Sequence, residues 1–351
     1  MTEVLIGFHV SRNPMFLIIQ IPCYNEVETL PAVVNSFPFV LPSISRIETL
    51  VIDDGSQDKT ADLAKSLGVD HVVRHNQNLG LATAFQTGLE TALKLGADII
   101  VNTDGDNQYP GDQIPHLIAP ILRGEADIVI GNRQTHTIAH FSPFKKKLQH
   151  WGSWVVRLVS GTNVPDATSG FRAYSREAAL RMSVLTRYTY TLETIIQAGK
   201  KGLRVVSVPV RTNPPLRESR LIKSNWSYVK HSAATILRLY ALYEPFRTFL
   251  YFSLPFLLIG ALLLSRFIIL YFVGATGVAR YIQSVAIGGT SLTIGFLLII
   301  LGIIADLIAT NRLLVEEMLY RLKRQELSTS AQPSRLIEKE PLFVESSPYR
   351  D

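Results

Sequence analysis

The sequence predicts an α/β fold, built on a mainly parallel sheet with helices on both faces and followed by a transmembrane helical hairpin. Up to about residue 222, short apolar runs alternate with helix-like patterns, which is typical of βαβ units. Two long apolar segments follow, and 47% of the 351 residues are hydrophobic. Acidic residues come directly after two of the short apolar runs, where a parallel sheet has its working loops.

Five apolar runs are predicted to be strands, at residues 16–22, 47–53, 70–74, 97–103 and 126–131. A helix is expected at 59–67, where Asp58 can cap the first turn and Gly68 ends the pattern. A second helix is expected from Leu81 to Gly96, because apolar residues recur there three and four apart. These elements make up a predicted N-terminal domain at residues 1–222.

The remainder of the chain is predicted to be a membrane anchor. Residues 223–245 have an apolar stripe flanked by basic side chains, which indicates an interfacial helix; a helix packed on the N-terminal domain is the alternative. Residues 246–311 hold two segments, 246–272 and 282–309, each long enough to cross a hydrocarbon core of about 30 Å. Residues 312–351 are predicted to be a cytoplasmic tail that is disordered at its end.

Charge and cysteine content indicate the compartment. Basic residues flank the outer ends of the two spans, so the positive-inside rule places both ends, and the N-terminal domain, in the cytoplasm. The single cysteine, Cys23, permits no internal disulfide and fits a reducing cytoplasm. The net charge of +6 suits an anionic membrane or phosphorylated substrates. Nucleic-acid binding is disfavoured, because the basic residues lie around the spans rather than among exposed aromatic residues.

The clearest chemical signal lies at residues 104–108. Asp104 and Asp106 stand one residue apart after an apolar strand, and Gln108 follows two residues later. Such a carboxylate pair can hold a divalent cation and leave coordination positions for phosphate oxygens, as Mg²⁺ prefers. Alone the triplet is weak evidence, because loop carboxylates are usually solvated. Asp53 and Asp54 end an earlier strand, so two acidic loops are predicted to converge on the same edge of the sheet.

These features, with the opening IPCYNE at 21–26, resemble the family 2 glycosyltransferases of the Rossmann-like GT-A fold. Within that family the chain looks most like the dolichyl-phosphate mannose synthases and the bacterial polyprenyl-phosphate glycosyltransferases with a two-span anchor. The similarity covers about residues 15–222. Further matching segments are VIDDGSQDKT at 51–60, an NxG helix start, a DxDxQ segment, GNR at 131–133 and TSGFR at 168–172.

The resemblance implies a function and a site. It implies transfer of a hexose from a GDP- or UDP-linked donor to a polyprenyl phosphate (undecaprenyl or dolichyl), with Mg²⁺ or Mn²⁺ bound by Asp104, Asp106 and Gln108. Arg133 is expected to add a second cation. The residues expected to bind the nucleotide-sugar are Pro22, Tyr24, Asn25, Glu26, Asp53, Asp54, Asn78, Gly80, Asp104, Gly105, Asp106, Thr168, Ser169 and Gly170.

The acceptor segment departs from the family pattern. Where the synthases commonly show R-G-x-S-K, this chain has Arg217-Glu218-Ser219-Arg220. Arg217, Ser219 and Arg220 are predicted to grip the lipid phosphate, for which guanidinium forks are well shaped. The alternative is a basic patch attracted to anionic lipids.

The predicted catalytic residues are Asp106, Arg133, Arg217, Arg220 and Glu193. The acceptor phosphate is already ionised near neutral pH, because its second pKa is about 6, so a strong general base is dispensable. Glu193 occupies the region where related enzymes that glycosylate hydroxyls keep a base, and is predicted to have a supporting role. A single in-line displacement predicts inversion at the anomeric carbon.

Two other hypotheses stand beside this one. The first is a membrane glycosyltransferase that acts on a glycolipid or polysaccharide hydroxyl and needs a true base. The second is a catalytically inactive membrane scaffold, against which the intact metal and arginine motifs argue. In each case the predicted location is a multi-pass protein of the cell membrane, and a homo-oligomer is compatible with the sequence.

Overall fold

The computed structural model describes residues 15–38, 40–133, 154, 156–157, 159–184, 190–214, 238, 240–273 and 282–330. These residues divide into two compact units. The second unit is bounded by Ala234–Leu319, and the first takes the described residues on either side of it. The first unit therefore holds the predicted N-terminal domain together with the end of the chain's last described helix.

A seven-stranded sheet forms the centre of the first unit, in the order β3-β2-β1-β4-β6-β5-β7. Neighbouring strands are parallel except β6, which runs antiparallel to β4 and to β5. The five predicted strands are confirmed, and β6 and β7 were not predicted. The strands are β1 Met15–Cys23, β2 Ile44–Asp53, β3 His71–Arg74, β4 Ile99–Asn102, β5 Ile128–Asn132, β6 Arg172–Ser175 and β7 Val205–Pro209.

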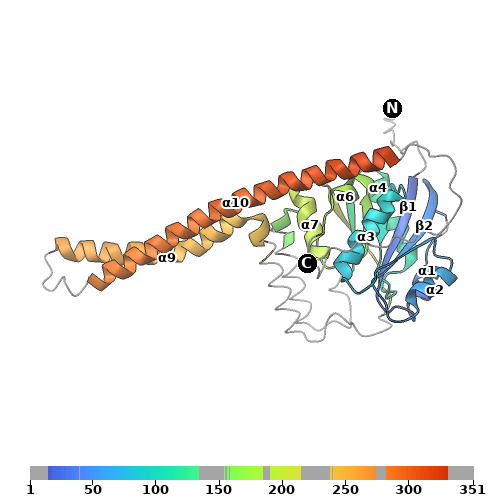
Figure 1. Ribbon diagram of the computed structural model, residues 1–351, viewed down its shortest axis with the longest axis horizontal. Helices are drawn as coiled ribbons and strands as arrows, with labels where there is room; N and C mark the ends of the chain where they lie inside the picture. The colour runs from blue at the N-terminus through green and yellow to red at the C-terminus, as the bar shows by residue number, and fades with distance from the viewer. Residues whose placement is uncertain are drawn as a thin grey trace, which may run out of the picture. The chain divides into compact units, whose positions relative to one another are not determined.

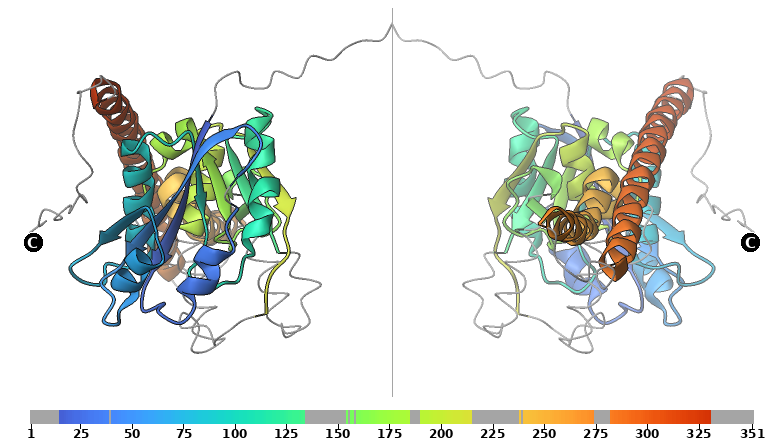
Figure 2. Two further views of the ribbon diagram at one scale, coloured as in Figure 1. Left: turned by 90° about the vertical axis from the view of Figure 1, so that its right-hand side faces the viewer. Right: turned by 90° about the vertical axis from the view of Figure 1, so that its left-hand side faces the viewer.

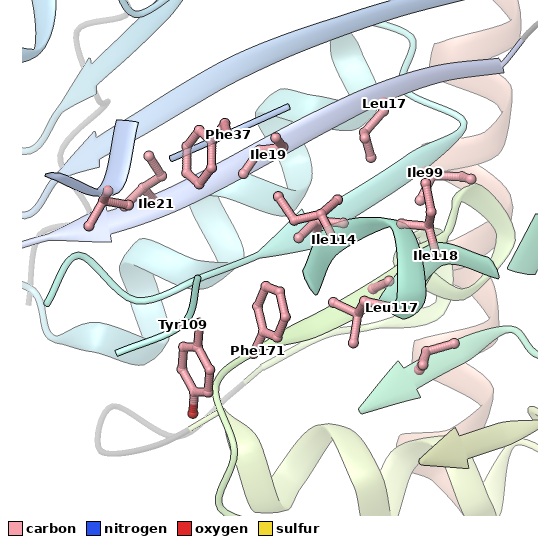
Figure 3. Close-up of a cluster of buried hydrophobic side chains, with 14 of the residues drawn as sticks. Leu17, Ile19, Ile21, Phe37, Ile99, Tyr109, Ile114, Leu117, Ile118 and Phe171 are labelled. Carbon is pink, nitrogen blue, oxygen red and sulfur yellow. The ribbon is translucent and has the colours of Figure 1, made fainter. Parts of the chain in front are cut away.

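Helices cover both faces of this sheet, as expected (Figures 1 and 2). On one face lie α1 (Leu30–Asn35), α2 (Thr60–Ser66) and α4 (Ile114–Leu122), whose apolar side chains join one buried cluster. Figure 3 labels the members from α4, which are Ile114, Leu117 and Ile118. On the other face α3 (Leu81–Lys94) packs so closely that a Cβ on Gly88 would lie 2.8 Å from Ile52 Cδ1. Among the described residues this unit also has the helices η1 Gly111–Gln113, α6 Arg176–Arg181 and α7 Thr191–Lys200.

The inner strand β1 is almost continuously apolar because both of its faces are covered. Leu17, Ile19 and Ile21 belong to the cluster beneath α1 and α4, and Ile18 is equally buried. A parallel strand covered on both faces has no solvent side, so alternation disappears. Gln20 is the polar exception, and its Nε2 donates to Asn102 Oδ1 on β4 at 2.8 Å.

The second unit contains two long apolar helices, α9 (Pro245–Phe272) and most of α10 (Ile282–Ser330). Both are long and apolar enough to cross a membrane, which agrees with the predicted hairpin. They approach through glycines: a Cβ on Gly260 would lie 2.7 Å from Leu292 Cγ, and one on Gly295 would lie 2.6 Å from Leu257 Cδ2. Small residues allow such backbone contact between membrane helices.

The helix α10 continues to Ser330, past the boundary at residue 311 that the apolar run indicates. Residues 312–327 are rich in Leu, Arg and Glu, which favour helix without a membrane. From Tyr320 onward this helix belongs to the first unit, where Tyr320 donates to Glu177 Oε1 at 2.7 Å and Lys323 donates to Glu90 Oε1 at 2.9 Å. Most of the predicted interfacial helix and residues 331–351 lie outside the described residues.

Candidate active site

The carboxyl ends of β1, β2 and β4 meet at one edge of the sheet. Cys23 at the end of β1 pairs with Asp53 on β2, and Gln20 pairs with Asn102 on β4. Beyond the strands, the Asp54 amide still donates to Cys23 O at 2.8 Å. The loops that carry the two acidic motifs therefore leave the same edge of the sheet, on either side of β1, as predicted from parallel pairing.

The loop after β4 concentrates negative charge. Asp104 and Asp106 lie close enough that burial, followed by the charge of Asp106, raises the pKa of Asp104 to about 7, although Arg133 and Arg172 act against this rise. Asp106 Oδ1 accepts a hydrogen bond from the Gln108 amide at 3.0 Å. Between them Asn107 has a left-handed backbone, with φ of 59°. A nearby cation would relieve the repulsion between the two carboxylates.

The donor set of this loop fits a hard divalent cation whose coordination is completed by a ligand. No group of three or more His, Cys, Asp or Glu side chains suited to a metal occurs among the described residues. Two carboxylates and the Gln108 amide oxygen would fill only part of an octahedral shell, which suits Mg²⁺ or Mn²⁺ shared with phosphate oxygens. The side chains present are therefore compatible with the predicted metal.

Two glycines allow other segments to approach this loop. A Cβ on Gly170 would lie 2.6 Å from both carboxylate oxygens of Asp104, so the Gly170 backbone lies directly against that side chain. A Cβ on Gly105 would lie 3.1 Å from Cys23 Sγ and 3.3 Å from Glu26 Cγ. Three of the predicted segments are thus brought together around Asp104.

Arg133, at the end of the GNR segment, is held by a buried carboxylate. Its Nε donates to Asp166 Oδ2 at 2.8 Å, and its Nη2 donates to Asp166 Oδ1 at 2.9 Å and to Thr168 Oγ1 at 2.7 Å. Burial would raise the pKa of Asp166, but the hydrogen bonds and charge of Arg133 outweigh it and hold that pKa below its ordinary value. Sequence reasoning missed Asp166, although a carboxylate two residues before Thr168 was visible.

Comparison with known proteins identifies the family. Residues 18–182 match the family described as "Glycosyl transferase family 2". The chain is 32% identical over 213 residues to the UDP-N-acetylglucosamine–dolichyl-phosphate N-acetylglucosaminyltransferase of Methanococcus voltae, covering 55% of this chain and 83% of that protein. It is 30% identical to the undecaprenyl-phosphate mannosyltransferase of Micrococcus luteus, covering 54% of this chain and 80% of the relative. This chain belongs to glycosyl transferase family 2.

The fold agrees with that membership. Glucosyl-3-phosphoglycerate synthase from Mycobacterium tuberculosis, solved with Mn²⁺, UDP and phosphoglyceric acid, superposes with a TM-score of 0.51 at 21% identity, over 64% of this chain and 78% of that one. This confirms the GT-A type of sheet that the resemblance implied.

In this family 2 glycosyltransferase, the first loop (residues 24–26, after β1) is hydrogen-bonded to the second loop (residues 54–58, after β2). Ser56 Oγ accepts from the Asn25 amide at 2.9 Å, and Asn25 Oδ1 accepts from the Gln57 amide at 2.8 Å. Asn25 also has a left-handed backbone, with φ of 55°. The next residue, Glu26, accepts from Thr29 Oγ1 at 2.8 Å. The conformations of the first and second loops are therefore interdependent at the positions predicted to bind the nucleotide.

The paired carboxylates at the end of β2 have different partners. Asp54 accepts from the amides of Leu79 and Gly80, both at 2.9 Å, and contacts His75 Nδ1 at 2.8 Å. It therefore orders the loop before α3, which contains the predicted Asn78 and Gly80. Asp53 is fully buried, with Oδ1 accepting from the Ser56 amide at 3.0 Å. Direct contact of either carboxylate with nucleotide stays a prediction.

A buried polar network behind the site was also missed. Asn102 Nδ2 donates to Gly170 O at 2.8 Å and to Tyr190 Oη at 2.9 Å, while Tyr190 stacks on Phe85 with centroids 3.9 Å apart. Arg172 of the TSGFR segment is fully buried and donates to Ser169 O and Thr191 O, both at 2.8 Å. These contacts fix the 168–172 backbone from within the domain.

The remaining predicted residues divide into two groups. Glu193 lies on α7, is completely buried, and accepts from Gln197 Nε2 at 3.3 Å. Its proposed supporting role stays a prediction. Arg217, Ser219 and Arg220 lie outside the described residues.

Proposed function

We propose that this glycosyltransferase transfers a hexose from a nucleotide-sugar to a polyprenyl phosphate at the cytoplasmic face of the cell membrane, with inversion at the anomeric carbon. One observation carries the proposal: Asp104, which shares its loop with Asp106, lies against the Gly170 backbone in a chain that also has two helices able to cross a membrane. A lipid acceptor confined to a bilayer requires an active site anchored there.

The relatives support this acceptor class. The names of the Methanococcus and Micrococcus proteins specify dolichyl phosphate and undecaprenyl phosphate, which are both isoprenoid monophosphates. Their donors differ, because one name specifies UDP-N-acetylglucosamine and the other a mannosyl group. The acceptor is therefore better supported than the sugar, and the donor is proposed only as GDP- or UDP-linked.

The metal chemistry follows from the acidic loop. Asp104, Asp106 and Gln108 would hold Mg²⁺ or Mn²⁺, and the structural neighbour from Mycobacterium tuberculosis was crystallised with Mn²⁺ and UDP. When bound, the ion would supply Lewis-acid stabilisation to the departing diphosphate. Because Gly170 has no side chain, its backbone lies directly against the Asp104 carboxylate. The acidic loop is therefore close to the 168–170 segment that is predicted to bind the nucleotide-sugar.

The cationic residues would contribute to catalysis by holding positive charge in fixed positions near the substrates. Arg133 is held in one orientation by Asp166, so its charge near Thr168 is preorganised rather than mobile. Arg217, Ser219 and Arg220 would hold the acceptor phosphate, whose ionised oxygen attacks without a strong base. Glu193, buried beside Gln197, would support the site rather than take a proton.

The test is transfer of a labelled sugar into lipid. The full chain in membranes is incubated with Mn²⁺ and a panel of GDP-mannose, UDP-glucose and UDP-N-acetylhexosamines, and label in the organic phase is counted. We expect one preferred donor and an acid-labile lipid-phosphate product. Asp106→Ala should lose nearly all transfer, whereas Asp112→Asn, an exposed carboxylate near the same loop, should retain it. Undiminished transfer by Asp106→Ala would refute the metal assignment.

The Glu193→Gln variant distinguishes a hydroxyl acceptor from the proposed phosphate acceptor. A hydroxyl must lose its proton during attack, so removal of a true base would abolish turnover. With a phosphate acceptor, the same variant should lower the rate but leave its pH dependence unchanged. Label recovered in an alkali-stable and acid-stable glycolipid would favour the alternative.

A further inference from the structure

The segment that follows β7 runs between two loops of the site. The Val210 amide donates to Asn132 O at 2.9 Å, which extends the pairing of β7 with β5. Three residues later, Asn213 makes two hydrogen bonds to the acidic loop. Its amide donates to Gln108 O at 2.9 Å, and its side-chain Nδ2 donates to Asn107 O at 2.9 Å.

These two bonds hold the backbone on which Asp106 depends. Asp106 Oδ1 accepts from the Gln108 amide, so the orientation of the carboxylate follows that of the Gln108 peptide. Asn107 has a left-handed backbone, which residues other than glycine adopt infrequently and which benefits from external support. Asn213 supplies this support by donating to the carbonyls of both residues.

We propose that Asn213 is a positioning residue for the metal loop: it holds Asn107 and Gln108 in the conformation that directs Asp106 toward the ion. This inference rests on the proposed function, because it assumes that the acidic loop binds a divalent cation. A loop held in its bound conformation loses less entropy when the ion binds, so affinity rises without a new contact to the ion. Asn213 also lies four residues before Arg217, so one short segment joins the metal loop to the predicted acceptor cations.

The experiment measures Mn²⁺ binding rather than turnover. The purified full chain in detergent is titrated with Mn²⁺ in the presence of UDP and, separately, GDP, and free Mn²⁺ is followed by its electron paramagnetic resonance signal. Asn213→Ala removes the side-chain donor and leaves the backbone donor. We expect its Mn²⁺ dissociation constant to rise by about two- to tenfold, the range for one hydrogen bond.

Arg211→Gln is the matched control. Arg211 belongs to the same segment, but its side chain is 74% exposed and pairs with Asp112 rather than with the acidic loop. This variant should bind Mn²⁺ as the wild type does. Asn213→Gln keeps the amide donor and should recover part of the affinity. If Asn213→Ala does not fold, as judged by its thermal melt without Mn²⁺, Asn213→Ser takes its place, since its hydroxyl is too short to reach the same carbonyl.

The outcomes separate this inference from the proposed function. If the wild type binds Mn²⁺ with nucleotide and the folded Asn213 variant binds it equally well, the inference is overturned and the proposed function stands. An equal loss in Arg211→Gln would also overturn it, because the effect would then belong to the whole segment. If the wild type binds no Mn²⁺ with either nucleotide, the metal site fails and both ideas fail with it.

Discussion

Arg133 and Asp166 form a two-bonded ion pair, with Nε 2.8 Å from Oδ2 and Nη2 2.9 Å from Oδ1. Only 10% of the Arg133 side chain and 2% of the Asp166 side chain are exposed. Both bonds are charge-assisted and match the planar fork of guanidinium, which lysine lacks. The pair connects the end of the GNR segment at 131–133 to a residue just before the TSGFR segment at 168–172. Gly170 of that second segment lies against Asp104.

Asp166→Asn should therefore destabilise the protein strongly. The substitution leaves the buried Arg133 charge without its carboxylate, and breaking one partner of a buried ion pair typically costs about 3–5 kcal/mol. Thermal unfolding in detergent measures the loss. The control is Arg123→Gln, which breaks an equally well-aligned pair with Glu125 on the exposed surface and should leave the melting temperature unchanged. Equal effects of the two variants would contradict the argument from burial.

The raised pKa of Asp104 predicts how metal-free stability depends on pH. The pKa of Asp104 is about 7 in the folded protein, against an ordinary value of 3.8, so between these values the folded state binds the proton that the unfolded state has released. Stability should then fall as the pH rises from about 4 to about 7 and level off above that. Melting of the metal-free protein at intervals of one pH unit tests this. Asp104→Asn should remove most of the decline; a decline of the same size in that variant would contradict the assignment to Asp104.

The sheet was largely predictable, because β1, β4 and the second half of β2 are apolar and buried on both sides, and the motifs that follow them mark the strand ends. One of the two strands that were missed, β6, shows where sequence patterns fail. β6 is only Arg172–Ser175, and it begins with a buried arginine, which is the opposite of the signal expected for a core strand. Arg172 is tolerated because backbone carbonyls accept its hydrogen bonds, and those carbonyls belong to the loop before β6 and to the first residue of α7.

Candidate site residues could be predicted where the side chains that act together are neighbours in the sequence, as Asp104 and Asp106 are. It was not predictable where the decisive contact joins distant residues. Asn102 appears in sequence as the end of a strand, yet its side chain contacts Gly170 and Tyr190, which lie 68 and 88 positions away. Similarly, Asn213 contacts Asn107 across 106 positions. No local pattern encodes such pairs, because tertiary packing selects them.

Gly170→Ala should weaken metal binding more than it weakens folding. The added methyl group would lie 2.6 Å from both oxygens of Asp104, so either the carboxylate rotates or the 168–170 backbone withdraws. Rotation of the carboxylate disturbs a predicted metal ligand and leaves the hydrogen bond from Asn102 to Gly170 O in place. We expect at least a tenfold loss of Mn²⁺ affinity in the presence of nucleotide, measured by titration. Nucleotide binding without metal is the control and should change little; wild-type Mn²⁺ affinity in this variant would show that the contact is unimportant.

The predicted membrane hairpin gives a prediction that does not depend on the chemistry. Gly295 on α10 faces α9 so closely that a Cβ would lie 2.6 Å from Leu257 Cδ2, whereas a Cβ on Gly289, on the same helix, would meet nothing within 4 Å. Close packing of small residues is the main attraction between apolar helices in lipid, where burial gives little advantage. Gly295→Leu should therefore separate the two helices and lower the melting temperature in detergent by several degrees.

Gly289→Leu adds the same side chain to the same helix without reaching its neighbour. It should leave the melting temperature near that of the wild type, since helix propensity is improved in both variants by the loss of glycine. Cysteines introduced at Leu257 and Gly295 provide a direct measure, because oxidation should cross-link them only if α9 and α10 pack as observed. Similar melting of the two leucine variants, with no cross-link, would show that the hairpin is not held by this glycine contact.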